Sequence, residues 1–300
     1  MRKCNNPLIP WLFLAPALLI LGVFVVYPIL CGAALAFFDF NMLRYDSAGH
    51  LLSPKWVGLA NFKRLAADPY LAVALKNSLL YVLLVPFLQA GSLLLAWLLR
   101  GETLKERLAR TALYVPVVTS AVVVGITWKW ILRSDGLLNQ ALGWFSFGLI
   151  EPVPWLTDSK LAIFSLMMVT AWQGLGYYLI LYLAGLQAIP KELEEHASLE
   201  GASVGQILLK IVVPLLKPTM AVCTLLSVIS ALKVFTEVFI ITGGGPQNST
   251  ITASYYIYMT AFENFDMGYA SALALILAII IGFASLIHYL LFKKDGWELN

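Results

Sequence analysis

The feature that most constrains this 300-residue chain is a series of long apolar runs that contain no Asp, Glu, Lys or Arg. A helix needs roughly 20 apolar residues to cross a bilayer. Most of the runs are long enough, and they predict five spanning helices. The runs cover residues 4–38, 77–99, 111–128, 161–190 and 267–292. A sixth span is predicted near 218–242, where Lys233 and Glu237 interrupt the apolar sequence.

Composition leads to the same class. Hydrophobic residues make up 60% of the chain and charged residues 12%, and the mean hydropathy is +0.81, far outside the range of soluble domains. We therefore expect an all-α polytopic membrane protein with one transmembrane domain over 1–300. The expected spans are about 9–38, 76–99, 111–132, 160–187, 217–242 and 268–292.

The basic residues predict the orientation, because Lys and Arg in short loops favour the cytoplasmic side. They flank the outermost spans and fill the second connection, whereas 134–159 and 239–267 contain none. Both termini are therefore expected in the cytoplasm. The connection 39–70 is the exception, since it carries four basic residues on the predicted outer side. The basic residues used are Arg2, Lys3, Lys293 and Lys294 at the termini and Arg100, Lys105, Arg107 and Arg110 in the connection.

Several other classes are excluded by what the sequence contains. The first apolar run is too long for a cleaved signal peptide and is expected to stay as a helix. Three cysteines without metal-like spacing imply no disulfide framework. No Gly-rich phosphate loop ending in Lys and Ser or Thr is present, so ATP is not expected on this chain. The sequence lacks a concentrated basic stripe, so a nucleic-acid partner is not expected.

An acidic segment at 189–218 lies between two apolar spans. Pro190 suits a first helical turn, acidic residues follow it, and Gly201 suits a C-terminal stop. Ser203 can cap a second short helix, and Pro214 ends or kinks that helix. The sequence therefore predicts a helix, a sharp turn and a helix. An ordinary solvated loop is the alternative interpretation of these charges.

The order of residues in this segment resembles the cytoplasmic coupling loop of ABC importer permeases. The matching positions are Glu195, Ala197, Gly201, Ala202, Ile211, Pro214 and Pro218. His196 stands where a small Ala is usual, and Glu200 stands where Asp is usual. The resemblance implies the ABC importer permease fold, with segment 189–218 as a helix–turn–helix that docks onto an ATPase.

Further stretches are similar to those of carbohydrate-uptake permeases of the maltose type. They are 57–62, 74–78, 128–130, 235–246 and 268–272. The resemblance implies sugar or oligosaccharide import by alternating access at the cytoplasmic (inner) membrane. It also implies a second permease subunit, two ATP-binding subunits that hold ATP and magnesium, and an extracytoplasmic sugar-binding protein. Similar permeases carry glycerol phosphate and other polar solutes, so that alternative stays open.

Polar side chains within the predicted spans are candidates for the substrate pathway, because polar groups in hydrocarbon are costly and usually face a cavity or another helix. For each residue, hydrogen bonding and packing between helices is the alternative. Lys233 and Glu237, four residues apart, are expected to pair within one helix, or else to reach separately to outer water. The candidates are Gln89, Trp172, Gln173, Tyr177, Lys233 and Glu237.

The run Gly243, Gly244, Gly245 and Pro246 cannot continue a helix and predicts the outer end of the fifth span. A flexible outer gate is the functional alternative.

Two other protein classes remain. A gradient-driven transporter would more typically show paired repeats and several buried carboxylates. A membrane enzyme is disfavoured because His50, His196 and His288 are scattered, so no catalytic or metal-binding residues are predicted.

Overall fold

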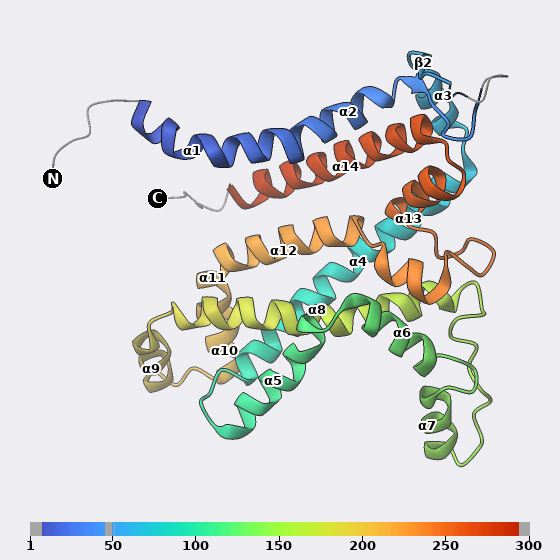
Figure 1. Cartoon of the computed structure of the whole chain (residues 1–300). Coiled ribbons are helices and arrows are strands. Elements are labelled where there is room, and N and C mark those ends of the chain that lie inside the picture. Colours follow the sequence, from blue (N-terminus) through green and yellow to red (C-terminus); the bar gives the residue numbers. More distant parts are fainter. Residues whose placement is uncertain (1–7, 46–49, 51, 294–300) are drawn as a thin grey trace. The chain divides into compact units, whose positions relative to one another are not determined.

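The computed structural model describes residues 8–45, 50 and 52–293. Arg2, Lys3 and Lys294, which supported the predicted orientation, lie outside the described residues. Most of the described chain is helical (Figure 1). The helices are α1 (Leu8–Leu21), α2 (Tyr27–Leu35), α3 (Ala60–Ala66), α4 (Pro69–Leu98), α5 (Leu104–Val118), α6 (Ala121–Ile131), α7 (Leu137–Phe145), α8 (Leu161–Gln187), α9 (Lys191–Leu199), α10 (Val204–Ile207), α11 (Val213–Leu215), α12 (Lys217–Leu232), α13 (Ala253–Tyr258) and α14 (Met267–Lys293).

The described residues also form the π-helical segments η1 (Gly22–Val26), η2 (Leu208–Val212), η3 (Val238–Thr242) and η4 (Met259–Glu263), of which η1, η2 and η4 continue a named helix. Two short strands, β1 (Phe38–Asp39) and β2 (Lys55–Trp56), pair antiparallel, with Phe38 opposite Trp56. The chain divides into two compact units, one formed by Met1–Asp68 and Ile257–Ala278 and the other by Pro69–Tyr256 and Ile279–Asn300.

Among the described residues, four helices are long and apolar enough to cross a membrane: Trp11–Leu35, Pro69–Leu98, Leu161–Gln187 and Met267–Lys293. Two bent pairs raise this number to as many as six. Helices α5 and α6 meet at 102°, and the helical stretch Val204–Leu215 meets α12 at 74°. The segment predicted as a span at 111–132 is therefore bent, because the backbone leaves the helical conformation at Thr119 and Ser120.

The predicted span at 217–242 is also interrupted. Helix α12 ends at Leu232, and helix resumes only at Thr236. The carbonyl of Val234, freed by this break, accepts a hydrogen bond of 2.6 Å from the Thr252 hydroxyl. Irregular backbone at membrane depth is tolerated where other parts of the protein satisfy it in this way.

In the first unit, the side chain of Asn61 anchors α3. Its amide donates to the carbonyls of Ala36 (2.9 Å) and Phe38 (3.0 Å), and the residue is buried. Arg64 pairs with Asp266 at 2.9 Å. These contacts hold the loop that follows α2 against the start of α14. The stretch Trp11–Leu35 has no buried residue of its own.

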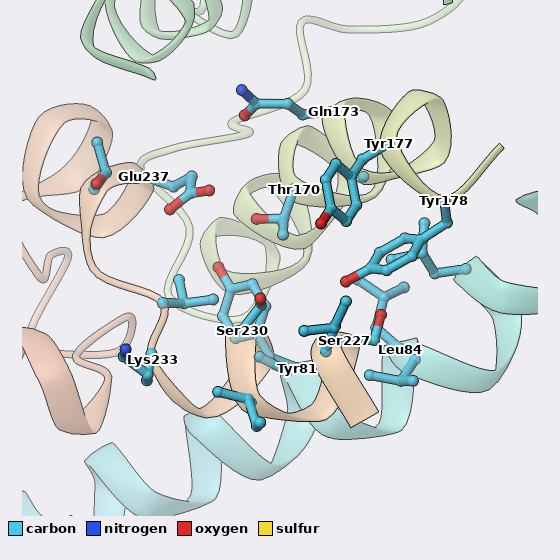
Figure 2. A pocket seen from close by; sticks show the side chains of 18 of the residues that line it. Tyr81, Leu84, Thr170, Gln173, Tyr177, Tyr178, Ser227, Ser230, Lys233 and Glu237 are labelled. Carbon is cyan, nitrogen blue, oxygen red and sulfur yellow. The ribbon is translucent and has the colours of Figure 1, made fainter. Parts of the chain in front are cut away.

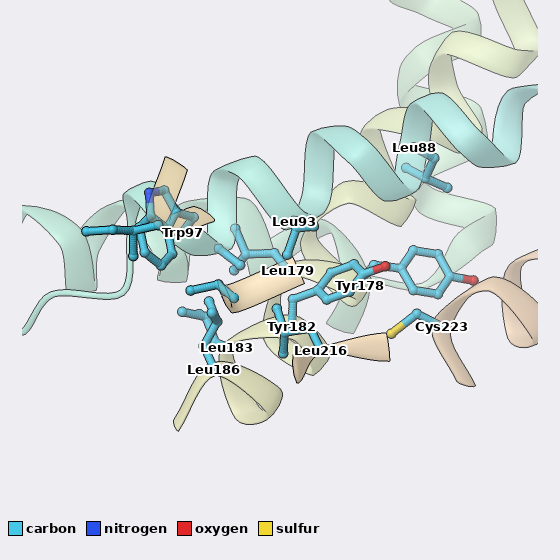
Figure 3. Close-up of a cluster of buried hydrophobic side chains, with 13 residues drawn as sticks. Leu88, Leu93, Trp97, Tyr178, Leu179, Tyr182, Leu183, Leu186, Leu216 and Cys223 are labelled. Atoms are coloured by element: carbon cyan, nitrogen blue, oxygen red, sulfur yellow. The ribbon is translucent and has the colours of Figure 1, made fainter. Parts of the chain in front are cut away.

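In the second unit, α8 packs against α4, α5 and α12. The buried apolar core lies between these helices and the segment after α9 (Figure 3). Gly176 lets α8 approach α5 closely, because a Cβ atom at this position would overlap the Leu113 carbonyl. Leu179 and Tyr182 of α8 are fully buried in this core.

Candidate functional site

A cavity of about 500 Å³ lies among α4, α8 and the break after α12 (Figure 2). Its polar lining consists of hydroxyl, amide and charged side chains drawn from these separate elements. Four of the residues predicted for the substrate pathway line this cavity. They are Gln173, Tyr177, Lys233 and Glu237. The other polar side chains include Tyr81, Thr170, Tyr178, Ser227 and Ser230.

Lys233 and Glu237 line the cavity but do not pair as predicted. The prediction of one shared helical face was wrong, because α12 ends between the two residues. No ion pair joins them in the described part of the chain. Lys233 is exposed and Glu237 is half-buried, and in Figure 2 they lie on opposite sides of the break. The break thus supplies the cavity with two charges instead of one neutralised pair.

Gln173 lines the same cavity and also stabilises the bend between α5 and α6. Its amide nitrogen donates to the carbonyl of Pro116 at 3.1 Å. In an uninterrupted helix that carbonyl would accept from residue 120, which here lies outside α5. Gln173 therefore replaces a helical hydrogen bond while it lines the cavity.

Gln89 and Trp172 do not line the cavity. The buried amide of Gln89 donates to Ser227 Oγ (2.7 Å) and accepts from the Tyr182 hydroxyl (2.7 Å). Trp172 packs edge-to-face on Trp128, with ring centroids 5.3 Å apart. These contacts favour interhelical packing, the alternative left open by the sequence, for both residues.

Tyr81 is a lining residue that sequence analysis did not select. It is only 1% exposed, and its hydroxyl has no hydrogen-bond partner among the described residues. A buried hydroxyl without a partner costs about 1–3 kcal/mol. Its position at the cavity leaves it available to a polar ligand. Its neighbours in the sequence are apolar, so no pattern distinguished it from a packing tyrosine.

Segment 189–218 has the predicted local structure. Helix α9 follows Pro190, and Gly201 has φ = +86°, a conformation that penalises any side chain. Ser203 accepts from the Gln206 amide, and the Gln206 side chain accepts from the Ser203 amide in return, so that the two form a capping box. The reciprocal part played by Gln206 was missed, although Ser-x-x-Gln is its sequence pattern.

The residues of this segment that were predicted to contact the ATPase differ in how exposed their side chains are. Glu195, His196, Glu200, Gly201 and Pro214 are exposed, while Ala197, Ala202 and Ile211 are half-buried. Ala197 and Ala202 pack against the buried core. A bulky imidazole at position 196 is therefore accommodated, because its side chain faces away from the core.

A groove of about 600 Å³ runs beside α9 and α10. Glu194 and Glu195 line it together with apolar Leu199, which is 85% exposed. Arg100, which follows α4, pairs with Glu194. Sequence analysis used Arg100 only as a marker of orientation, and no pattern linked two residues 94 positions apart.

The glycine run lies away from the main cavity. Gly243 and Gly244 have positive φ angles of 57° and 80° and end η3, as predicted for the end of a span. The Thr250 hydroxyl donates to the Gly245 carbonyl at 2.8 Å. Gly245 and Pro246 border a separate hollow of about 660 Å³.

Metal chemistry has no evident site here. Across residues 8–45, 50 and 52–293, no group of three His, Cys, Asp or Glu side chains is placed to hold a metal ion.

Comparisons with known proteins identify relatives along the whole chain. The family model "Binding-protein-dependent transport system inner membrane component" matches residues 7–294. The chain is 35% identical over 299 residues to the probable ABC transporter permease protein YurN of Bacillus subtilis, covering 98% of this chain and 99% of that protein. It is 34% identical to the lactose transport system permease protein LacF of Rhizobium radiobacter, covering 93% and 92%.

A further relative is the arabinooligosaccharides transport system permease protein AraP of Halalkalibacterium halodurans, which is 31% identical over 97% of this chain and 90% of that protein. Among solved structures, the chain resembles a bacterial ABC transporter involved in the import of the acidic polysaccharide alginate. The TM-score is 0.80 at 22% identity, covering 95% of each chain. This likeness supports the predicted fold.

Proposed function

Because the chain belongs to the family of binding-protein-dependent transport system inner membrane components, we propose that it is the permease subunit of an ATP-driven importer of a sugar or oligosaccharide. The observation that carries the proposal is the 500 Å³ cavity between helices, lined by hydroxyl, amide and aromatic side chains. Such side chains suit a ligand made of hydroxylated rings. The sugar-transport names of LacF and AraP support the same cargo class.

The proposed pathway passes through this cavity. Tyr81, Gln173 and Tyr177 supply hydrogen-bonding groups and ring faces, and Lys233 and Glu237 supply charge at the break after α12. Alternating access would expose the cavity to one side of the membrane at a time. Glu237 can accept hydrogen bonds from sugar hydroxyl groups, and such charge-assisted bonds are stronger than neutral ones.

Segment 189–218 is the proposed docking site for an ATP-binding subunit. It offers an exposed helix, a left-handed turn at Gly201 and an exposed apolar residue, Leu199, next to a groove. ATP and magnesium would be bound by that partner. The proposed assembly has a second permease subunit, two ATP-binding subunits and an extracytoplasmic sugar-binding protein. It would lie in the cytoplasmic membrane with both termini of this chain in the cytoplasm.

Reconstitution tests the proposal. The chain, its partner permease, the ATP-binding subunits and the binding protein are assembled in proteoliposomes, and uptake of labelled lactose, arabinooligosaccharides and glycerol phosphate is measured. We expect uptake of a sugar only when ATP and all partners are present. Uptake of glycerol phosphate alone would identify a different polar cargo. Uptake driven by an ion gradient in liposomes that contain this chain alone would contradict the proposal.

Two variants test the docking site in the same system. Gly201→Leu forces a side chain into a positive-φ turn, and Glu195→Lys reverses a charge at the groove. We expect normal insertion in the membrane but loss of ATP-dependent uptake. Lys191→Gln, at the start of the same helix, serves as the matched control. Normal uptake by both variants at normal abundance would exclude this segment as the docking site.

A further inference from the structure

We propose that Arg100 is a positioning residue that fixes α9 to the end of α4 and thereby transmits movement of the docking segment to the cavity. This inference rests on the proposed function. It concerns a contact between two helical elements that are distant in sequence, and it adds a mechanical role to a residue that does not line the cavity.

The contact uses one edge and one face of the Arg100 guanidinium group. Nη1 of Arg100 donates to both carboxylate oxygens of Glu194, at 2.7 and 2.6 Å. The guanidinium carbon also lies 3.5 Å from the ring centroid of Trp97. Arginine suits this arrangement because its planar, permanently charged group can stack on an aromatic ring while it binds a carboxylate.

The Arg100 side chain is 40% exposed, so what distinguishes this pair from an ordinary surface ion pair is the setting of the two groups that Arg100 contacts. Exposed pairs contribute little, since water screens them and their long side chains must be ordered. Here Trp97 is 6% exposed and belongs to the buried core (Figure 3), and the Glu194 side chain is 19% exposed. Stacking on a fixed ring orders the arginine before the carboxylate binds, so less entropy is lost when the pair forms.

Helix α9 depends on this contact because it has little other attachment. None of its residues is buried. Ala197 packs against the core from this helix, and the turn after it is held by the Ala202 amide, which donates to the Ala197 carbonyl at 2.9 Å. The link from Glu194 to Arg100 is therefore the polar connection that joins α9 to the end of α4.

Helix α4 then provides a continuous path to the cavity. Trp97 and Tyr81 lie on the same uninterrupted helix, 16 residues and thus about 24 Å apart. Between them, Gln89 bonds to Tyr182 of α8 and Ser227 of α12. A displacement of α9 that pulls on Arg100 would therefore move α4 together with the two helices that complete the cavity wall.

The experiment compares Arg100→Ala, Arg100→Lys and Glu194→Gln with the wild-type complex in proteoliposomes. Sugar uptake, ATP hydrolysis and the amount of bound ATP-binding subunit are measured on each preparation. Arg107→Ala is the matched control, because Arg107 lies in the same connection and its described side-chain contact is with the Glu102 carbonyl. ATP-dependent uptake by the wild type is established first, so that failure of the proposed function is recognised separately.

We expect Arg100→Ala, which lies outside the proposed docking segment, to retain the ATP-binding subunit and hydrolysis within about twofold. Glu194 belongs to that segment, so Glu194→Gln is compared per bound subunit. Sugar moved per ATP should fall roughly tenfold, within the range of typical coupling between sites. Arg100→Lys should lie in between, since it keeps the charge but loses the planar stack. Exchanging the charges, Arg100→Glu with Glu194→Arg, should recover part of the loss.

Hydrogen exchange across α9 supplies a readout that needs no transport. Faster exchange there in Arg100→Ala than in Arg107→Ala would support the positioning role. Wild-type sugar moved per ATP in Arg100→Ala would overturn the inference. An equal loss of bound subunit, hydrolysis and uptake in all three variants would also overturn the inference, because it would show that the contact is needed only for assembly of the complex.

Discussion

At the scale of single residues, the amide of Gln89 joins three helices. It belongs to α4 and bonds to Ser227 of α12 and Tyr182 of α8, and only 6% of the residue is exposed. Because it uses both its donor and its acceptor in these contacts, we expect its contribution to be stability. The cavity is lined instead by the adjacent residue Leu88 and by Val85, one turn earlier in α4.

Replacing Gln89 tests this assignment. Gln89→Leu leaves the Tyr182 and Ser227 hydroxyls without their partner, and interhelical hydrogen bonds of this kind contribute about 0.6–1.7 kcal/mol each. We expect a lower thermal midpoint in detergent, measured by size-exclusion chromatography after heating, with normal uptake per folded complex. Tyr182→Phe removes one of the bonds and should cost less. A changed cargo preference in Gln89→Leu would instead make it a pathway residue.

Glu237 and Lys233 are expected to act independently, since the helix breaks between them. Glu237→Gln should lower sugar uptake about tenfold, because bonds to a charged acceptor contribute roughly 1.5–3 kcal/mol. The double exchange Lys233→Glu with Glu237→Lys should not restore activity. Glu151→Gln, an exposed carboxylate away from the cavity, is the control for initial uptake rates. Recovery in the double exchange would show that the two charges do pair in the assembled transporter.

At the scale of secondary-structure elements, close helix packing depends on Gly176 of α8. A methyl group there would overlap the Leu113 carbonyl of α5, whereas at Gly174 it would meet the movable end of Leu88 at 3.1 Å. We expect Gly176→Ala to destabilise the protein by about 1–3 kcal/mol or more, and Gly174→Ala to cost less. Membrane abundance and the unfolding midpoint of the two variants would measure this difference. Equal values would contradict it.

The first turn of α5 carries a pH-sensitive cap. The side-chain hydroxyl of Thr103 (2.7 Å) and its backbone amide (2.9 Å) donate to Glu106 Oε2. These bonds favour the carboxylate and hold the pKa of Glu106 below its usual value of about 4.3. Since the folded pKa is the lower one, the cap stabilises α5 fully above the unfolded value and is lost as pH falls through the folded value.

Carbon-13 NMR of protein labelled at glutamate can follow this titration, with Glu106→Gln used to assign the signal. We expect Glu106 to titrate below the exposed glutamates, and Thr103→Val to move its titration upward because the hydroxyl donor is gone. An unchanged titration in Thr103→Val would mean that the hydroxyl does not hold the carboxylate.

The sequence predicted those elements that local rules determine and missed those that depend on distant partners. Apolar runs located the long helices, and Pro190, Gly201 and Ser203 located the turn after α8, because caps and positive φ are decided by neighbouring residues. The break at Lys233 depends on the hydrogen bond that the Thr252 hydroxyl donates to the Val234 carbonyl. The bend after Val118 likewise depends on Gln173. Neither partner is visible in the sequence around the break.

The candidate site follows the same division. Polar residues inside apolar spans indicated Gln173 and Tyr177, which line the cavity, because the cost of burying polar groups restricts where they can face. Gln89 obeys the same rule but faces other helices. Tyr81 and Arg100 were not selected, since tyrosine is common in helix packing and arginine is common at helix ends, and only their three-dimensional neighbours distinguish them.

At the scale of the whole molecule, the number of spans remains a prediction that labelling can test. With the native cysteines replaced by serine, single cysteines at Glu102, Ser198, Gln140 and Glu263 report the side on which each exposed position lies. Six spans with cytoplasmic termini place Glu102 and Ser198 inside and Gln140 and Glu263 outside. An impermeant thiol reagent should therefore label the first two only in inverted vesicles. Labelling of all four from one side would exclude the six-span arrangement.

The stretch Trp11–Leu35 buries none of its residues within this chain, while α8 buries many along its length. A side chain that contacts only fluid hydrocarbon is constrained in its hydrophobicity but not in its shape. A side chain that fills a fixed space in a packed interior is constrained in both. Random mutagenesis should therefore recover many apolar exchanges among Leu, Ile, Val and Phe in Trp11–Leu35 and few around Gly176. The amino-acid sequence of Trp11–Leu35 would then change quickly between lineages. The sequence of α8 would change slowly, because each substitution must fit the side chains packed against it.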